Sequence, residues 1–352
     1  MKRKLSALAL VLIAAAASAD VLQKIDPPEQ GFYAQRMDYE GIPIKASAAV
    51  SAQALLAAHD RLFMMLRLIP SAAENLRAQG AELHLIGKDQ APSDLPENLG
   101  TKGKPFDGAE TIDQRTRGTG GILASCGEEN LLKLDRDRYA GRDICVHEFS
   151  HALHVYGLSK DIQALITRQY ADAMKKGLWK GLYASTNERE YFAELTMWYF
   201  GTRGDADKLP QTWRPGPRWL KSYDPEGYDL LDRIYSGALE IRRKKIVPLA
   251  KLPPSREKDL RASSGDAVTV IFVNNSSRPV RIYWLDFEGN RKSYGGIPAL
   301  GRQDQRTFTT HPFLITDEND RGLAVFVAGS EDATATIVDA DFSLRPVSST
   351  KQ

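Results

Sequence analysis

The spacing of apolar side chains divides the chain into two parts with different periods. Between about residues 21 and 245, several long segments carry apolar residues every three to four positions, as amphipathic helices do. This spacing predicts helices over 51–68, 142–156, 160–176, 187–200 and 228–243. Gly201 follows the fourth of them as a C-cap. Shorter extended segments are predicted at 82–86 and 118–124, and the Pro-, Gly- and Asp-rich stretch 91–113 is typical of an exposed loop.

The period changes near residue 265. The segments that follow are short, rich in β-branched and aromatic residues, and separated by turn residues; they lie at 267–273, 280–287, 306–309 and 323–327. The stretch before them, 246–265, contains prolines and charges and is typical of a linker. We therefore predict an α+β protein, with a mostly helical domain over 20–245 and a small all-β sandwich over 266–346.

The first 19 residues have the pattern of a secretory signal peptide. Three basic residues at 2–4 precede an apolar run at 5–16, and the small-x-small sequence at 17–19 favours cleavage before Asp20. The apolar run is shorter than the roughly 20 residues that span a bilayer, which disfavours an uncleaved anchor. We expect an exported protein, periplasmic or secreted, without stable membrane insertion after cleavage.

The charge balance gives no reason to expect a nucleic-acid partner. The full sequence has 47 Lys and Arg against 45 Asp and Glu, and three of the positive charges lie in the signal peptide. The mature chain is therefore close to neutral and has no basic field that would attract a polyanion.

The only cysteines are Cys126 and Cys145. In an exported protein an even pair favours a disulfide over two buried thiols. The bond would end two residues before His147 and would brace the start of the helix that carries it.

The strongest chemical signal is the sequence His147-Glu148-Phe149-Ser150-His151 on a predicted helix. Histidines four residues apart lie about 40° apart around a helix and one turn apart along it, so both imidazoles can bind one zinc ion. Glu148 follows one step round, where its carboxylate can accept a proton from a zinc-bound water. The alternative is a pair of solvated or core histidines. Because three of the six histidines fall within 147–154 in an apolar segment, we favour the metal site.

A third metal ligand must come from outside this motif. His154 lies on the same helix face, but three histidines along one helix span about 10 Å, while Zn–N bonds are about 2.1 Å. His154 is therefore expected to pack against or support the site. Glu190 and Glu194 share an apolar helix face, where a carboxylate needs a partner such as a metal. Glu190 equally fits a capping box begun by Asn187, and the pattern alone leaves both roles open.

The segments 147–154 and 183–194 together resemble the C-terminal catalytic domain of anthrax lethal factor and its relatives. The shared features are an HEFxH helix and a Tyr seven residues before a Glu in a Tyr…Asn-Glu-x-Glu-aromatic-Phe-Ala-Glu run. The resemblance implies a zincin-like zinc peptidase, with one zinc ion held by His147, His151 and Glu190.

The same resemblance implies roles for the remaining residues of these segments. Glu148 would be the general base, and Tyr183 would donate a hydrogen bond to the oxyanion that forms during hydrolysis. Glu194 would orient a ligand histidine. The large substrate-recognition regions of the toxin are absent, so the toxin function itself does not carry over.

The C-terminal segment resembles the β domain of the von Hippel–Lindau tumour suppressor, through residues 270–276 and 282–289. That family binds a hydroxyproline-containing peptide, and the matching pocket positions here are Tyr294, Thr307, Phe308, His311 and Phe313. The two phenylalanines stand where the family has Tyr and Trp, so two hydrogen-bond donors are lost. The resemblance implies a peptide-binding groove; the alternative is a structural appendage with packed aromatic residues. The family's helical partner-binding domain is absent, so no ubiquitin-ligase role is implied.

Together these features predict an exported zinc metallopeptidase that acts on a peptide or protein, with the β module as an accessory binding domain. One alternative is a binding protein in which the β module docks a peptide and zinc is structural or absent. Another alternative is a hydrolase that cleaves a cell-wall amide or another acyl group instead of a peptide bond in a protein.

Overall fold

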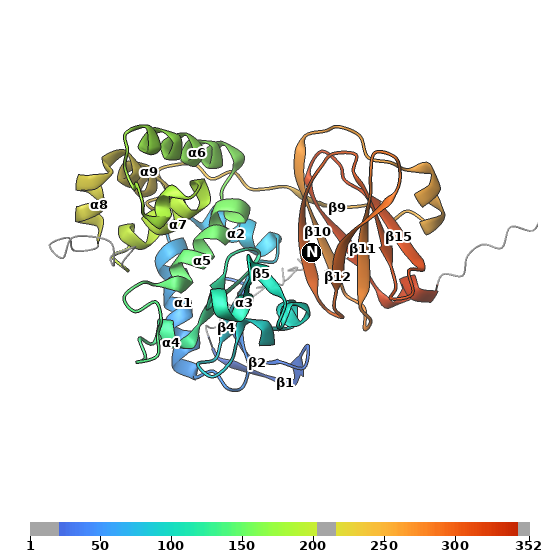
Figure 1. The fold of residues 1–352 in the computed structure, drawn as a ribbon, viewed down its shortest axis with the longest axis horizontal. Helices are drawn as coiled ribbons and strands as arrows, with labels where there is room; N and C mark the ends of the chain where they lie inside the picture. The colour runs from blue at the N-terminus through green and yellow to red at the C-terminus, as the bar shows by residue number, and fades with distance from the viewer. Residues whose placement is uncertain (1–20, 203–215, 344–352) are drawn as a thin grey trace, which may run out of the picture.

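The computed structural model describes residues 21–202 and 216–343 (Figure 1). The signal peptide expected at 1–19 lies outside the described residues, as do the last residues of the module expected to end at 346. Helices and strands are both abundant, and strands dominate after residue 260, which confirms the predicted α+β class. No helix in the described ranges is long and apolar enough to cross a membrane.

The N-terminal part is built on a six-stranded mixed sheet with the order β1-β2-β3-β4-β8-β7. Its strands are β1 (Gln23–Glu29), β2 (Tyr33–Tyr39), β3 (Ile42–Ala46), β4 (Glu82–Ile86), β7 (Gly118–Thr119) and β8 (Leu123–Gly127). β3, β4 and β8 run parallel, and parallel neighbours need long crossovers. The first crossover consists of α1 (Ala52–Leu66) and α2 (Pro70–Ala78).

The second crossover holds only short elements. They are η1 (Pro92–Asp94), η2 (Pro96–Thr101), β5 (Pro105–Asp107), β6 (Glu110–Thr111) and α3 (Ile112–Arg115). The stretch 91–113 was expected to be an exposed loop, but it is partly buried because Leu95 packs against Tyr33 and Ile86.

Helices form the rest of the N-terminal part. They are α4 (Glu128–Leu131), α5 (Ile144–Ala152), α6 (Lys160–Lys175), α7 (Glu188–Tyr199), α8 (Pro217–Tyr223) and α9 (Pro225–Tyr235). The helices predicted over 51–68, 160–176 and 187–200 are confirmed, and Gly201 has the left-handed φ of +70° that a C-cap glycine supplies.

Two helix boundaries differ from the prediction for local reasons. The helix predicted over 142–156 changes at Leu153 into the π-helical turn η3 (Leu153–Gly157). The helix predicted over 228–243 begins at Pro225, because Asp224 caps it through the Gly227 amide at 2.9 Å, and it ends at Tyr235.

The C-terminal part is a β sandwich of two four-stranded sheets, ordered β13-β10-β16-β9 and β12-β11-β14-β15. Its strands are β9 (Ile246–Pro248), β10 (Ala267–Asn274), β11 (Val280–Leu285), β12 (Arg291–Ile297), β13 (Arg302–Phe308), β14 (Pro312–Thr316), β15 (Gly322–Val327) and β16 (Asp332–Ile337), followed by η7 (Asp339–Ser343). The inward faces share a core that includes Phe272, Ile282 and Phe326.

The stretch 246–265, expected to be a linker, is packed against this sandwich. β9 pairs in parallel with β16, Leu252 bridges to Val325, and the short helix η6 (Pro254–Asp259) contacts β15. Proline has no backbone N–H to donate, but at the edge of a sheet β9 can still pair with one neighbour. Its proline content is nevertheless typical of a linker, so composition alone did not predict a strand here.

The two parts meet along β13, an edge strand of the sandwich. Arg302 donates hydrogen bonds to the carbonyl of Gly80 at 2.5 Å and to the carbonyl of Gln79. Tyr156, at the end of η3, donates to the carboxylate of Asp304. These contacts hold β13 against the N-terminal part beside α5.

A buried charge network lies on β2, β3 and β4, close to this junction. Tyr33 donates to Glu97 at 2.7 Å, and His84 lies between Glu97 (2.5 Å) and Glu82 (2.9 Å). Lys45 pairs with Glu82 at 2.8 Å. Burial lowers the pKa of His84, but the two carboxylates outweigh burial and raise that pKa to about 9.

We predict that this network makes stability fall in mildly alkaline solution. His84 is charged in the folded protein, so its contribution is complete below the unfolded pKa of about 6.5 and is lost as pH rises through about 9. Urea titrations between pH 6 and 9.5 should show a loss of roughly 1–3 kcal/mol over this window. In His84→Gln this part of the pH dependence should disappear, and an unchanged profile in that variant would contradict the assignment.

Candidate metal centre

Helix α5 is fixed at its first turn by side chains and by a covalent bond. Asp143 caps the helix by accepting the Val146 amide at 3.0 Å, and Asn130 accepts the Ile144 amide at 2.8 Å. The expected disulfide between Cys126 and Cys145 is present and ties this turn to β8, with the two Cα atoms 5.1 Å apart. The motif helix is therefore held at one end by a cap and by the sheet.

The structure brings His147, His151 and Glu190 together. The His147 Nε2 atom lies 3.0 Å from Glu190 Oε2 and 3.3 Å from His151 Nε2, and the latter lies 3.4 Å from Glu190 Oε2. Donors of a tetrahedral zinc site with bonds of 2.0–2.1 Å are roughly 3.3–3.4 Å apart. The three atoms are thus spaced as a zinc ion requires, and two imidazoles with one carboxylate are a usual zinc donor set.

The sequence left two roles open for Glu190, metal ligand or part of a helix cap, and in the structure they involve different atoms of the residue. Asn187 is the N-cap of α7, and its side chain accepts the amides of Arg189 at 2.9 Å and Glu190 at 3.0 Å. Burial alone would raise the pKa of the Glu190 carboxyl, but the two histidines that it faces hold this pKa well below the usual range. The cap therefore uses the backbone of Glu190 and leaves its side chain for the site.

Glu148 and Glu194 complete the acidic surroundings. Carboxylate and imidazole atoms of Glu148, His147 and His151 lie within 4.8 Å of one another, and burial raises the pKa of Glu148. Glu194 is fully buried; its Oε1 atom lies 3.2 Å from Nδ1 of His147 and accepts from Arg142 at 2.9 Å. Burial lowers the pKa of His147, but the carboxylates outweigh burial and raise that pKa to about 10. The cluster thus stabilises positive charge at the point where the ligand atoms converge.

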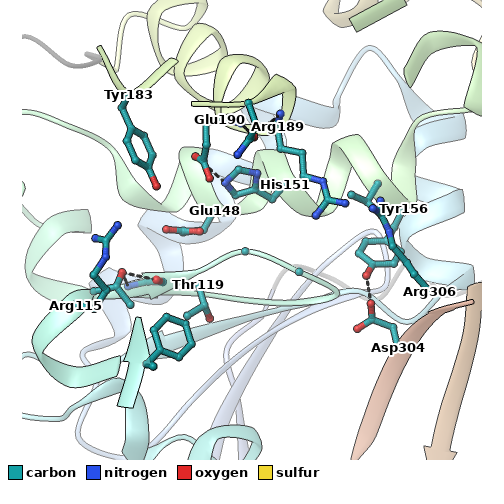
Figure 2. A pocket seen from close by; sticks show the side chains of 17 residues that line it. Arg115, Thr119, Glu148, His151, Tyr156, Tyr183, Arg189, Glu190, Asp304 and Arg306 are labelled. Carbon is teal, nitrogen blue, oxygen red and sulfur yellow. Dashed lines mark hydrogen bonds and ion pairs between the residues drawn. The ribbon is translucent and has the colours of Figure 1, made fainter. Parts of the chain in front are cut away.

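Tyr183 lies at the start of η4 (Tyr183–Ser185), half-buried, and its phenol points toward Glu148 and Glu190 (Figure 2). Burial and neighbouring carboxylates raise its pKa, so the hydroxyl stays protonated at neutral pH. The positive charge of Arg115, which also lines the cleft, acts in the opposite direction and lowers this pKa.

His154 does not join the cluster. It is buried against the ring of Phe192, with the ring centres 5.1 Å apart, and burial lowers its pKa to about 3. A neutral, packed imidazole is consistent with the supporting role expected from helix geometry.

The glycines at 118–121 let the edge of the sheet approach α5 closely. A Cβ atom on Gly120 would lie 2.6 Å from the His151 ring, and one on Gly118 would lie 3.0 Å from the Glu148 side chain. At Gly118 the carbonyl of Ser125 and the Ile144 side chain would be nearer still, at 2.7 and 2.8 Å. The sequence predicted an extended edge that allows close approach of another chain segment, and in the structure that segment is α5 together with the neighbouring strand β8.

A cleft of about 620 Å³ opens over these residues. Besides the motif it is lined by residues that the sequence analysis did not single out, among them Arg115, Thr119, Arg189, Asp304 and Arg306 (Figure 2). The last two come from β13 of the sandwich. Their contribution depends on the packing of distant segments, and no local pattern marks it.

The expected peptide-binding positions of the sandwich only partly form a surface. Thr307 and His311 are joined by a hydrogen bond of 2.9 Å, and Tyr294 and Phe308 are exposed. Phe313, however, is 1% exposed and packs against Phe272 in the sandwich core, so it is not available to a ligand.

Two aromatic residues that were not predicted lie beside His311. The Trp284 and Phe287 rings are 5.1 and 6.0 Å from the His311 ring, and Phe287 is 52% exposed. Phe287, Tyr294 and Phe308 are exposed and Trp284 is half-buried, so these four residues form a partly exposed aromatic cluster beside the buried His311.

Comparison with known proteins supports the C-terminal module. Residues 260–330 match the family model of the VHL beta domain. No curated protein gives a significant match. Among the 20 matching chains of solved structures is a protein from Eubacterium rectale, 13% identical over 22% of this chain and 82% of its own, with a TM-score of 0.16. A score this low carries no argument about the fold.

We predict that Glu190 is required for metal binding. Purified wild type should retain about one zinc ion per chain after dialysis against a weak chelator, whereas Glu190→Ala should retain much less, because a carboxylate ligand is lost. The metal content can be measured by inductively coupled plasma mass spectrometry. Glu188→Ala is the matched control, since Glu188 is in the same helical turn and does not line the cleft. Equal zinc in both variants would remove Glu190 from the ligand set.

Proposed function

We propose that the chain is an exported zinc-dependent metallopeptidase. The observation that carries this proposal is the convergence of the His147, His151 and Glu190 donor atoms at 3.0–3.4 Å, with the Glu148 carboxylate in the same cluster. The disulfide between Cys126 and Cys145 supports export, because such bonds persist in oxidising compartments.

The proposed chemistry assigns a separate task to each residue. His147, His151 and Glu190 would hold a zinc ion, which when bound would supply Lewis acidity and lower the pKa of a bound water toward about 7. Glu148 would accept the proton of the attacking water and later return it to the leaving amine.

Two further residues stabilise or position the reacting groups. Tyr183 donates a hydrogen bond to the oxygen that becomes negative during attack, since its raised pKa keeps the phenol protonated at neutral pH. Glu194 fixes the ring of His147 from the opposite side.

The edge of the sheet favours a peptide over other acyl substrates. β7 is the end strand of its sheet, and the glycine backbone that follows it lies beside Glu148 and His151. An extended peptide can lie along such an edge, with its carbonyl groups presented to the site.

A second role, peptide binding by the sandwich, is favoured by the partly exposed aromatic cluster around His311 and by the VHL beta domain match. Aromatic surfaces bind proline-rich and other extended peptides. This role is compatible with catalysis in the N-terminal part, because its residues are not those that line the cleft.

We predict that Glu148→Gln binds zinc but loses hydrolysis. Glutamine keeps the shape of the side chain and cannot accept the proton, so kcat on a cleaved peptide should fall by about 10²–10⁴-fold. Activity can be followed by mass spectrometry of a peptide library, with zinc content measured on the same samples. Glu188→Gln should behave as wild type. Full activity in Glu148→Gln would exclude the assigned base.

A further inference from the structure

The sandwich contributes one wall of the candidate catalytic cleft. Alternate residues of β13 share one face, and Asp304 and Arg306 on that face line the same cleft as Glu148 and His151. The register places Ile271 of β10 opposite Asp304, and Ile271 is 1% exposed although it lies outside the sandwich core. The outward face of this sheet is therefore covered where β13 meets the N-terminal part.

The position of β13 in the cleft is fixed by polar contacts on either side. Arg302 is anchored on the carbonyl groups of the neighbouring residues Gln79 and Gly80, and Lys160 donates to the carbonyl of Ala267 at 3.0 Å. Asp304 follows Arg302 on the same face of β13, and its carboxylate accepts a hydrogen bond from the Tyr156 phenol. Position 306 is two residues further along this face, so its backbone is held at the cleft.

Two exposed arginines line this end of the cleft. Arg306 comes from β13 and Arg189 from the first turn of α7. Within the described ranges neither guanidinium forms an ion pair. Asp304 lies two residues from Arg306 on the same face, where its carboxylate accepts the hydrogen bond of the neutral Tyr156 phenol. Figure 2 shows both side chains extending toward the same end of the cleft, past His151.

The chemistry of this pair specifies an anionic group on the substrate. A guanidinium fork matches the two oxygens of a carboxylate, and two such forks on one side of a cleft repel each other unless an anion lies between or beside them. The carboxylates on the other side, Glu148 and Glu190, face the histidines and do not compensate the pair.

We propose that Arg189 and Arg306 form a subsite for a carboxylate of the substrate, so that the enzyme prefers peptides with an acidic group beside the cleaved bond. The inference rests on the proposed peptidase function, and it makes the sandwich part of the substrate site. The carboxylate belongs either to an Asp or Glu side chain or to the free C-terminus of a short peptide.

The test uses the full-length mature protein and a set of quenched peptides that share one neutral sequence. Glu, Gln or Lys is placed at each position around the cleaved bond, and each peptide is made with a free and an amidated C-terminus. Wild type should give a kcat/KM about 10- to 100-fold higher for Glu than for Gln at one position. A preference seen only with the free terminus would assign the subsite to the terminal carboxylate.

Charge reversal supplies the decisive comparison. Arg306→Glu should lower the Glu-to-Gln ratio to one or below and raise the ratio for Lys, whereas Arg261→Glu, at an exposed arginine of the sandwich outside the cleft, should keep the wild-type ratio. Equal kcat/KM for acidic and neutral peptides in wild type would overturn the subsite while leaving the peptidase proposal intact.

A binding measurement keeps the two proposals separable if no peptide is cleaved. Fluorescence anisotropy of labelled Glu and Gln peptides with Glu148→Gln protein reports recognition without hydrolysis. Tighter binding of the acidic peptide that Arg306→Glu abolishes would support the subsite even if the peptidase function failed. Equal binding of both peptides would overturn it.

Discussion

The contact between α5 and α7 determines whether this chain can carry out the proposed chemistry. It places a glutamate from one helix against two histidines of the other and buries a second glutamate, Glu194, completely. A buried carboxylate is costly unless it is paired, and Glu194 is balanced by Arg142 and by His147. Apolar residues such as Phe149 and Phe192 supply the surrounding core. The polar cluster is thus surrounded by an apolar core that fixes the two helices against each other.

Much of this arrangement could be predicted from local sequence. The His147–His151 spacing and the helix that carries Glu190 are local patterns marked by a period or a cap, and the disulfide was expected from the even number of cysteines. The structure reproduces those elements and the disulfide, and it separates the two roles that the sequence left open for Glu190, since the cap uses its backbone and the site uses its side chain.

Other features depend on contacts that no local pattern records. β1 contains two prolines and is mostly exposed, and β2 buries only alternate residues among polar ones, so neither has the apolar character that marked the other strands. Phe313 matched a pocket position by sequence but faces the sandwich core, because strand alternation directs it inward. Arg306 reaches the cleft only because β13 packs beside α5, which is a property of the whole fold.

The bond between Cys126 and Cys145 has a consequence for the cell that makes this protein. It joins β8 to the first turn of α5, and thiols remain reduced in the cytosol. If the chain is exported as proposed, it lacks the covalent brace on its motif helix until it has crossed the membrane. Maturation of the proposed site would then follow translocation, and a newly made molecule would be less able to damage the proteins around it.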